Sequence, residues 1–201
     1  MACYAIDDIT PVIDSSSFVH PSATVIGDVI IGPDCYVAPN AVLRGDFGRI
    51  QLIEGVNIQD TCVMHGFPNT VTLVEKNGHI GHGAVLHGCV IKENALVGMN
   101  SVIMDGAVIG ESSIVAAMSF VKANEVIADK TLVAGSPART IRQLSDEEIS
   151  WKTQGTEDYH RLTKRCFESL QEVEPLTEVE AGRKRLNVSD SMPLYITKQK
   201  E

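Results

Sequence analysis

Aliphatic residues recur every six positions along most of the chain. A six-residue period fits neither the 3.6 residues per turn of a helix nor the alternation of a half-buried strand, and it is typical of hexapeptide β-helix repeats. Three hexapeptides then make one triangular coil, with the aliphatic side chain inside and a glycine or small polar residue at the corner. The residues on this period are Val19, Val25, Ile31, Val37 and Leu43; Leu52, Ile58 and Met64; Ile80 and Leu86; and Ile91, Val97, Ile103, Ile109, Val115 and Val121.

The period ends near residue 140, where a different pattern begins. Ser145 and Glu148 form a capping box that starts a short helix. A second helix is expected after Thr156, because apolar residues recur at three- and four-residue steps up to Val173, and Pro175 would end it. We therefore predict a β-helix over residues 1–140, C-terminal helices packed alongside it over 141–173, and an extended or partly disordered tail over 174–201.

Composition narrows the function classes. The net charge of −9 at pH 7 does not suggest the positive face that nucleic acid requires. No apolar run approaches the roughly 20 residues that cross a bilayer, and the N-terminus lacks the pattern of a signal peptide, so we expect a cytoplasmic protein without membrane contact. The five cysteines are scattered without C-x-x-C spacing, which predicts reduced thiols that fill the core.

Stacked coils predict which side chains become neighbours. A three-residue insertion before Leu52 and a bulge over residues 67–78 absorb the departures from the repeat. Arg44, His65 and His87 each directly follow an inward aliphatic residue, so they should form one column on successive coils. Because adjacent strands lie about 4.8 Å apart, two stacked imidazoles can both reach one ion at roughly 2.0–2.1 Å.

The stretch HIGHGAVLHG gathers His79, His82 and His87 within nine positions. His82 leaves the prism on a different face from His65 and His87, so a neighbouring subunit related by a three-fold axis would have to supply it to the same ion. That arrangement gives three histidine ligands with open positions, as catalytic zinc requires. The alternative is a set of surface histidines in turns, and this is the interpretation we give to His79 and His20.

The motifs LRGDFGRI, NIQD, MHG and HIGHGAVLHGCVI together resemble the γ-class carbonic anhydrase-like family of hexapeptide proteins, over most of residues 15–140. The resemblance implies a left-handed parallel β-helix and a homotrimer. It also implies that His65, His82 and His87 bind Zn²⁺, or another divalent ion such as Fe²⁺ or Co²⁺, at the subunit interface. Arg44 and Asp46 would form an ion pair across that interface, and Asn57, Gln59 and Asp60 would lie near the metal-bound water.

Within this family the chain looks most like a branch that acts in phenylacetate degradation, with the carnitine-operon branch next. The resemblance then implies a thioesterase that hydrolyses coenzyme A esters of ring-hydroxylated phenylacetates. Gln59 would orient the nucleophile, assisted by Asn57, and Tyr159 would either donate a proton or serve as an ordinary helix-packing residue. Where the archetypal anhydrase has acidic residues beside the metal, this chain has Phe47 and Phe67, which suit an apolar acyl group and cannot carry a proton. The alternative is that both phenyl rings pack between subunits.

Other functions stay open. The same metal site could hydrate CO₂, because some anhydrases of the family also lack the acidic pair. VAGSPART, at residues 133–140, resembles the segment that closes the β-helix of hexapeptide acyltransferases, so an acyltransferase without a metal and a non-catalytic trimeric scaffold are further alternatives. The cationic residues that would meet the phosphates of a coenzyme A thioester are Arg139, Arg142, Lys164 and Arg165.

Overall fold

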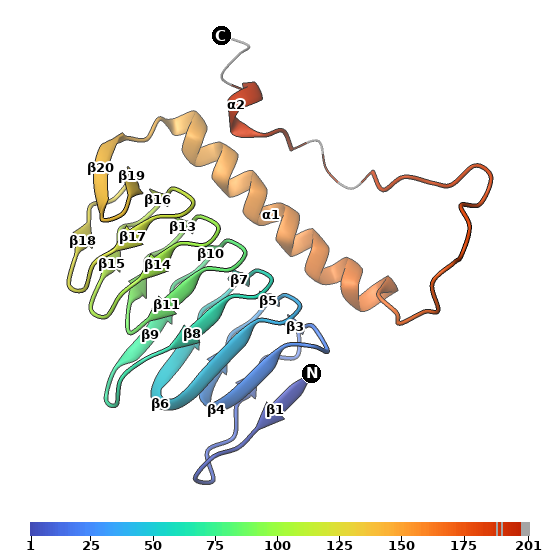
Figure 1. Ribbon diagram of the computed structural model, residues 1–201, viewed down its shortest axis with the longest axis horizontal. Helices are drawn as coiled ribbons and strands as arrows, with labels where there is room; N and C mark the ends of the chain where they lie inside the picture. Colours follow the sequence, from blue (N-terminus) through green and yellow to red (C-terminus); the bar gives the residue numbers. More distant parts are fainter. Residues whose placement is uncertain (188, 190, 198–201) are drawn as a thin grey trace.

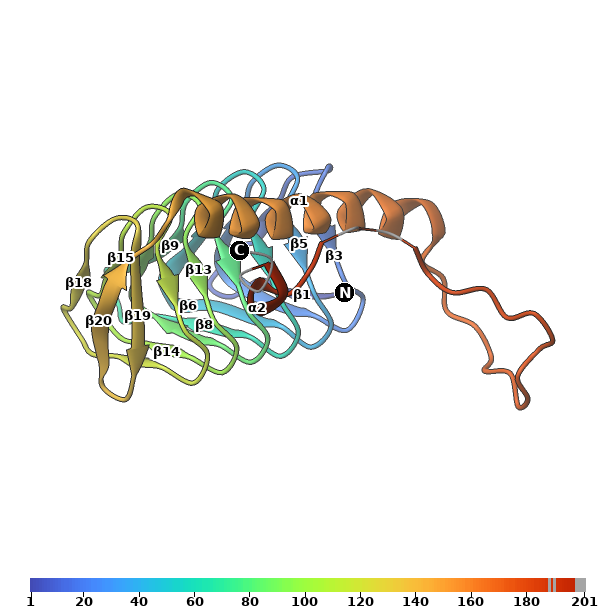
Figure 2. The ribbon, with the colours of Figure 1, turned by 90° about the horizontal axis from the view of Figure 1, so that it is seen from above.

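The computed structural model describes residues 1–187, 189 and 191–197, and its main body is a parallel β-solenoid. Successive coils stack along one axis, and a long helix runs along one side of the prism (Figures 1 and 2). The interior is filled by three columns of aliphatic side chains, one for each side of the triangle. One column is Val25, Leu43, Met64, Leu86, Ile103 and Val121, all fully buried. The six-residue period therefore predicts the core correctly.

Two sides of the prism belong to one 12-stranded sheet. Two long strands, β4 (Thr24–Ile31) and β6 (Val42–Leu52), bend from one of these sides to the other and so join the two sides into one sheet. On one side, β6 is followed by β8 (Val63–His65), β11 (Val85–His87), β14 (Val102–Ile103) and β17 (Phe120–Val121). On the other, it is followed by β9 (Val71–Val74), β12 (Val90–Ile91), β15 (Val108–Ile109) and β18 (Val126–Ile127). At the N-terminal end, β1 (Ala2–Tyr4) and β2 (Val12–Ile13) pair with β4.

The third side is an eight-stranded sheet, and the helix α1 (Asp146–Ser169) packs against it. Its strands are β3 (Phe18–Val19), β5 (Tyr36–Val37), β7 (Asn57–Ile58), β10 (His79–Ile80), β13 (Leu96–Val97), β16 (Ile114–Val115), β19 (Thr131–Gly135) and β20 (Ala138–Gln143). The predicted capping box is present, since Ser145 accepts from the Glu148 N–H and Glu148 accepts from the Ser145 N–H. Lys152 anchors the helix by donating to Asn77 O and Asn94 Oδ1, each at 2.7 Å.

The structure corrects several boundaries that the sequence predicts. Two C-terminal helices are predicted, but α1 is one continuous helix through Gly155, because Lys152 and Thr156 on either side are both buried against the solenoid. It ends at Ser169 rather than Val173. The solenoid closes with an antiparallel β19–β20 hairpin that runs to Gln143, beyond the predicted limit of 140. The tail also contains a short helix, α2 (Leu194–Thr197).

The two insertions also differ from the prediction. Residues 71–74, which the sequence places in a bulge, form strand β9 and pair with β6 and β12, so only a short turn remains outside the sheet. The extra residues before Leu52 extend β6 into an 11-residue strand, with a register shift against β4 between Gly27 and Val29. Both insertions thus lie in β-structure beside the predicted histidine column, and they do not form free loops.

The cysteines form no disulfides, and all but Cys3 are buried, as expected of thiols that fill the core. In the part of the chain that the structure describes, no helix is both long enough and apolar enough to cross a membrane.

Candidate metal centre

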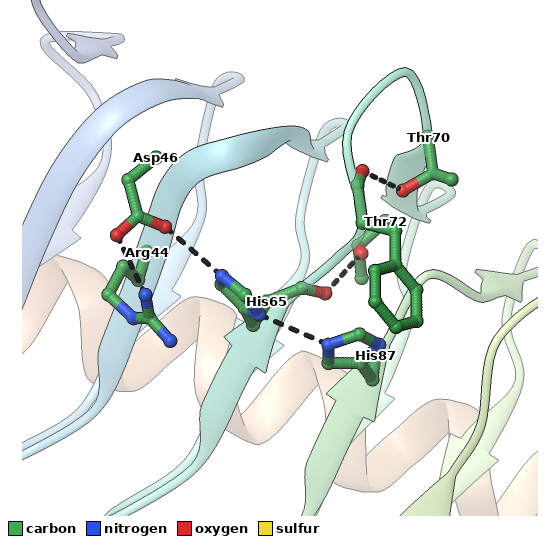
Figure 3. A network of polar contacts seen from close by, with 7 residues as sticks. Arg44, Asp46, His65, Thr70, Thr72 and His87 are labelled. Carbon is green, nitrogen blue, oxygen red and sulfur yellow. Dashed lines mark hydrogen bonds and ion pairs between the residues drawn. The ribbon is translucent and has the colours of Figure 1, made fainter.

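His65 and His87 lie next to each other on adjacent coils. They are register partners on β8 and β11, and His65 Nδ1 lies 3.1 Å from His87 Nε2 (Figure 3). Strand stacking brings them together, because each follows an inward residue of the same core column, Met64 or Leu86. The predicted column is therefore present. Both side chains are only partly exposed, at 14% for His65 and 24% for His87.

The outer nitrogen of each ring is held by an aspartate. His65 Nε2 lies 3.1 Å from Asp46 Oδ1, and His87 Nδ1 lies 2.6 Å from Asp105 Oδ1. A carboxylate accepts the ring proton, so in the neutral histidines the protonated nitrogens are the outer ones. The two facing nitrogens then both carry lone pairs directed toward each other, an arrangement in which both could bind one cation. Two ligands of one tetrahedral ion at about 2.05 Å lie roughly 3.3 Å apart, close to the separation found.

Sequence reasoning missed two residues of this site, Asp105 and Thr72. Asp105 follows His87 by one 18-residue coil, so the same stacking rule could have identified it. Thr72 is fully buried and lies in the segment that the sequence assigns to a bulge. Its hydroxyl donates to His65 O at 2.7 Å (Figure 3). It also accepts from the N–H of Gly88 at 3.0 Å, so it connects the backbones that carry the two histidines.

Arg44 and Asp46 form an ion pair within one chain, with 2.7 Å between Arg44 Nη1 and Asp46 Oδ2. The two residues meet within the chain because positions two apart on β6 point to the same side of the strand, and the pair across a subunit interface stays a prediction. Burial tends to raise the pKa of Asp46, but hydrogen bonds from Arg44 and His65 bring it below its ordinary value. An ionised Asp46 therefore connects Arg44 to His65.

His82 occupies the corner between the third side and the β8–β11 side of the prism. Its Nδ1 lies 2.5 Å from Asp60 Oδ2 on the coil before it, so its ring, too, is oriented by an aspartate. Gly83 follows in the left-handed region, at φ of 70°, and a Cβ there would lie 2.2 Å from Asn100 Oδ1. Glycine at this position allows the corner to turn tightly directly after the histidine. His82 is half-exposed, with 47% of its side chain open to solvent.

Asn57 and Gln59 lie beneath α1, on the same side of the prism as His79. Gln59 Nε2 donates to Asn57 Oδ1 at 3.0 Å and contacts His79 Nε2 at 2.7 Å. The interpretation of His79 as a surface histidine is therefore wrong, because α1 packs against its ring. Burial, together with the charge of Lys152, lowers the pKa of His79 to about 3, so this histidine is neutral.

Tyr159 projects from α1 into an aromatic cluster and not toward His65. Its ring lies 5.5 Å from that of Tyr36 and 5.3 Å from that of His79. Burial, with further contributions from nearby Asp60 and Tyr36, raises its pKa far above the usual value. Tyr159 thus stays protonated and packs against Tyr36 and His79. Its predicted role as a proton donor stays a prediction.

Phe47 and Phe67 flank the histidine pair. The Phe47 ring lies 5.4 Å from that of His65, and the Phe67 ring meets that of His87 edge-on at 5.1 Å. More than half of each phenyl side chain is exposed, at 61% and 56%. The site therefore opens onto two solvent-facing aromatic surfaces, where the sequence predicts a pocket for an apolar group.

The candidate residues divide into two groups on one chain. One contains His65 and His87 with Asp46 and Asp105; the other contains His82 with Asp60, and lies one corner away. Across residues 1–187, 189 and 191–197, no three His, Cys, Asp or Glu side chains of a single chain form a group that could hold a metal ion. His82 and the His65–His87 pair therefore do not form one such group within the described part of a single chain.

Two of the arginines proposed to meet coenzyme A phosphates have partners within the chain. Arg142 donates to both carboxylate oxygens of Glu148, at 2.7 and 2.8 Å, in the capping box of α1. Arg139 donates to the carbonyl of Ala138 at 3.0 Å. Arg142 therefore holds the start of the helix, and its contact with a phosphate stays a prediction.

Comparison with known proteins gives consistent matches. Residues 10–45 and 88–123 match the family described as bacterial transferase hexapeptide (six repeats). The carnitine operon protein CaiE of Escherichia coli O81 is 56% identical over 194 residues, which cover 96% of this chain and 99% of that protein.

Two solved structures share the fold. A Bacillus cereus protein assigned as an acetyltransferase has a TM-score of 0.80 and 35% identity, over 81% of this chain and 95% of its own. A hexapeptide transferase family protein from Anaplasma phagocytophilum has a TM-score of 0.78 and 37% identity, over 81% and 96%. Both alignments leave about a fifth of this chain uncovered.

Proposed function

The chain belongs to the hexapeptide-repeat transferase family that includes the carnitine operon protein CaiE, and we propose that it is a metal-dependent hydrolase of coenzyme A thioesters. The observation that carries this proposal is the pair of facing imidazole nitrogens, 3.1 Å apart, whose rings are each held by an aspartate on the other side. A transferase that uses only acid–base chemistry has no need of two lone pairs directed at one point.

The donor set fits a borderline ion of the zinc type. Three imidazoles, two from one subunit and His82 from the next, leave open coordination positions, and each ring has the carboxylate partner that is typical of metal-ligating histidines. Zn²⁺ is the expected ion, with Fe²⁺ or Co²⁺ as alternatives. When bound, such an ion lowers the pKa of a coordinated water towards about 7 and polarises a carbonyl oxygen.

The protein's own residues supply orientation. Gln59 lies on the third side of the prism, and His82 lies at the corner of that side. The neighbouring subunit that brings His82 to the ion therefore also brings Gln59, whose amide is fixed by Asn57 and His79. Gln59 holds the attacking water, while Asp46, Asp60 and Asp105 keep the rings in their ligating tautomer. The exposed rings of Phe47 and Phe67 receive the acyl group.

We propose a ring-hydroxylated phenylacetyl group as the acyl part, in line with the resemblance to the phenylacetate-degradation protein PaaY. The name of the CaiE relatives supports a second candidate, a carnitine-derived acyl group. The aromatic pair is compatible with both, because phenyl faces pack against an aryl ring and also attract a quaternary ammonium group. Hydroxyphenylacetyl-CoA and carnitinyl-CoA are therefore the first two substrates to compare.

One experiment separates the proposal from its rivals. A purified, metal-loaded sample is assayed for thiol release from a panel of coenzyme A thioesters and for CO₂ hydration, with and without chelator. Chelator-sensitive thiol release supports the proposal. CO₂ hydration without thiol release indicates an anhydrase, chelator-resistant acyl transfer indicates a metal-independent acyltransferase, and no activity indicates a scaffold.

The shared site predicts complementation between two inactive variants. We expect His65→Ala and His82→Ala proteins each to be inactive alone, because each disrupts every site of a homotrimer. When they are unfolded together and refolded as mixed trimers, about a quarter of the sites receive intact histidines from both neighbours. Thiol release should recover to about that fraction of wild type. No recovery in verified mixed trimers would show that the three histidines do not meet between subunits.

Asp105 should control metal affinity without being a ligand. Asp105→Asn keeps the shape but removes the carboxylate that fixes the tautomer of His87. We expect metal affinity to fall roughly 10- to 100-fold, measured by competition with a chelator of known affinity. Asp129→Asn, at a carboxylate that accepts from the Glu111 N–H and is bonded to no candidate histidine, serves as the matched control and should bind metal as wild type does. Unchanged affinity in Asp105→Asn would remove Asp105 from the site.

A further inference from the structure

A chain of polar contacts connects Gln59 to the helix α1. Gln59 Nε2 lies 2.7 Å from His79 Nε2, and the other ring nitrogen, His79 Nδ1, lies 3.3 Å from Thr156 Oγ1. Gln59 and Thr156 are both buried, at 3% and 2% exposure, and His79 is partly buried between them. None of these three residues touches the predicted ligands His65 and His87, so the metal site does not explain these contacts.

The direction of each hydrogen bond follows from its neighbours. The Thr156 hydroxyl donates to the carbonyl of Lys152 in the same helix, at 3.4 Å, so its lone pair faces His79. His79 Nδ1 then carries the ring proton and donates it to Thr156, which leaves Nε2 as an acceptor because the ring is neutral. Gln59 therefore has to point its NH₂ group at His79, and the same group donates to Asn57 Oδ1.

We propose that His79 is a positioning residue that holds the amide of Gln59 with its carbonyl oxygen outward, and that Thr156 of α1 sets the tautomer of His79 that makes this possible. Gln59 then offers the site an acceptor only. It can take a hydrogen bond from an attacking water or a hydroxyl group, and it cannot donate one to the oxygen of a thioester carbonyl. This inference rests on the proposed function for its catalytic consequence, but the hydrogen-bond direction stands apart from it.

A double-mutant cycle tests whether His79 acts through Gln59. His79→Phe keeps an aromatic ring but removes the acceptor, and we expect kcat for thiol release to fall roughly tenfold with little change in KM. In a Gln59→Leu background the same change should have no further effect on kcat. His79→Gln, which restores an acceptor at a similar reach, should recover most of the activity. An equal loss from His79→Phe in both backgrounds would overturn the proposal.

His160 provides the matched control. It lies on α1, as Thr156 does, and it joins α1 to the solenoid through a 3.0 Å contact between its Nε2 and Gly55 O. It does not contact Gln59. His160→Phe should therefore leave kcat at the wild-type value. If His160→Phe lowers kcat as much as His79→Phe, loss of a helix contact explains both effects and His79 has no specific role.

Nuclear magnetic resonance of the metal-free protein tests the geometry without any activity. The ¹⁵N shifts of His79 should report a neutral ring protonated at Nδ1, and the Gln59 side-chain amide protons, identified by their loss in Gln59→Leu, should be protected from exchange. In His79→Phe that protection should fall. A ring protonated at Nε2, or Gln59 signals unchanged in His79→Phe, would overturn the proposal. If these signals behave as expected while no thioester is hydrolysed, the proposed function fails and the positioning role of His79 stands.

Discussion

His87→Ala protein is expected to bind far less than one metal ion per subunit, with an affinity more than roughly 100-fold below that of wild type. The substitution removes one of three proposed ligands and leaves the lone pair of His65 Nδ1 without its partner at 3.1 Å. It also removes the His87 ring nitrogen from which Asp105 accepts a hydrogen bond. The measurement is elemental analysis of trimers loaded with excess Zn²⁺ and then dialysed.

Two comparisons make this result specific. His20→Ala removes a histidine that bonds only locally, to Ser22, and it should bind metal as wild type does. Cys62→Ala and Cys89→Ala should also retain the metal, because burial raises the pKa of these thiols to about 11 and about 12 and keeps them protonated. Full occupancy in His87→Ala together with loss in either cysteine variant would refute the histidine site.

The second large effect concerns the reaction. Hydrolysis of hydroxyphenylacetyl-CoA should vanish in His65→Ala and in metal-free wild-type protein, because both lack the ion that activates water. In the loaded enzyme, the rate should rise as the pH increases through about 7, since the deprotonated form of that water is the nucleophile. The measurement is thiol release over a pH series, after metal analysis of every sample. Undiminished thiol release from metal-free protein would exclude this mechanism.

Phe47→Glu separates the two reactions that one metal site could perform. The new carboxylate would lie beside His65, where we propose that the exposed phenyl ring meets the acyl group. It adds a charge against an apolar substrate and a proton carrier where the native chain has none. We expect thiol release to fall more than CO₂ hydration does. Vigorous CO₂ hydration with no thiol release in wild type would instead identify an anhydrase.

Much of the fold and half of the candidate site follow from the sequence. A hexapeptide repeat has one inward position in six, and parallel strands stack in register, so Met64 and Leu86 place His65 beside His87 once the four residues beyond one 18-residue coil are assigned to the insertion after His65. The same rule would have placed Asp105 beside His87, one coil of 18 residues later. Such relations depend only on counting along a regular coil, which is why the sequence determines them.

Tertiary structure decided the rest, because those features depend on contacts between segments far apart in the chain. The sequence indicates helical character after Ser145 but not that a single helix covers His79, which lies 77 positions from its partner Thr156. Likewise, residues 71–74 look like part of an insertion until they pair with β6 and β12, and only that pairing buries Thr72 behind the two histidines. Within the stacked coils, the repeat determines which residues are neighbours. The positions of the insertions and the helix depend on the free energy of packing against those coils, which local spacing does not encode.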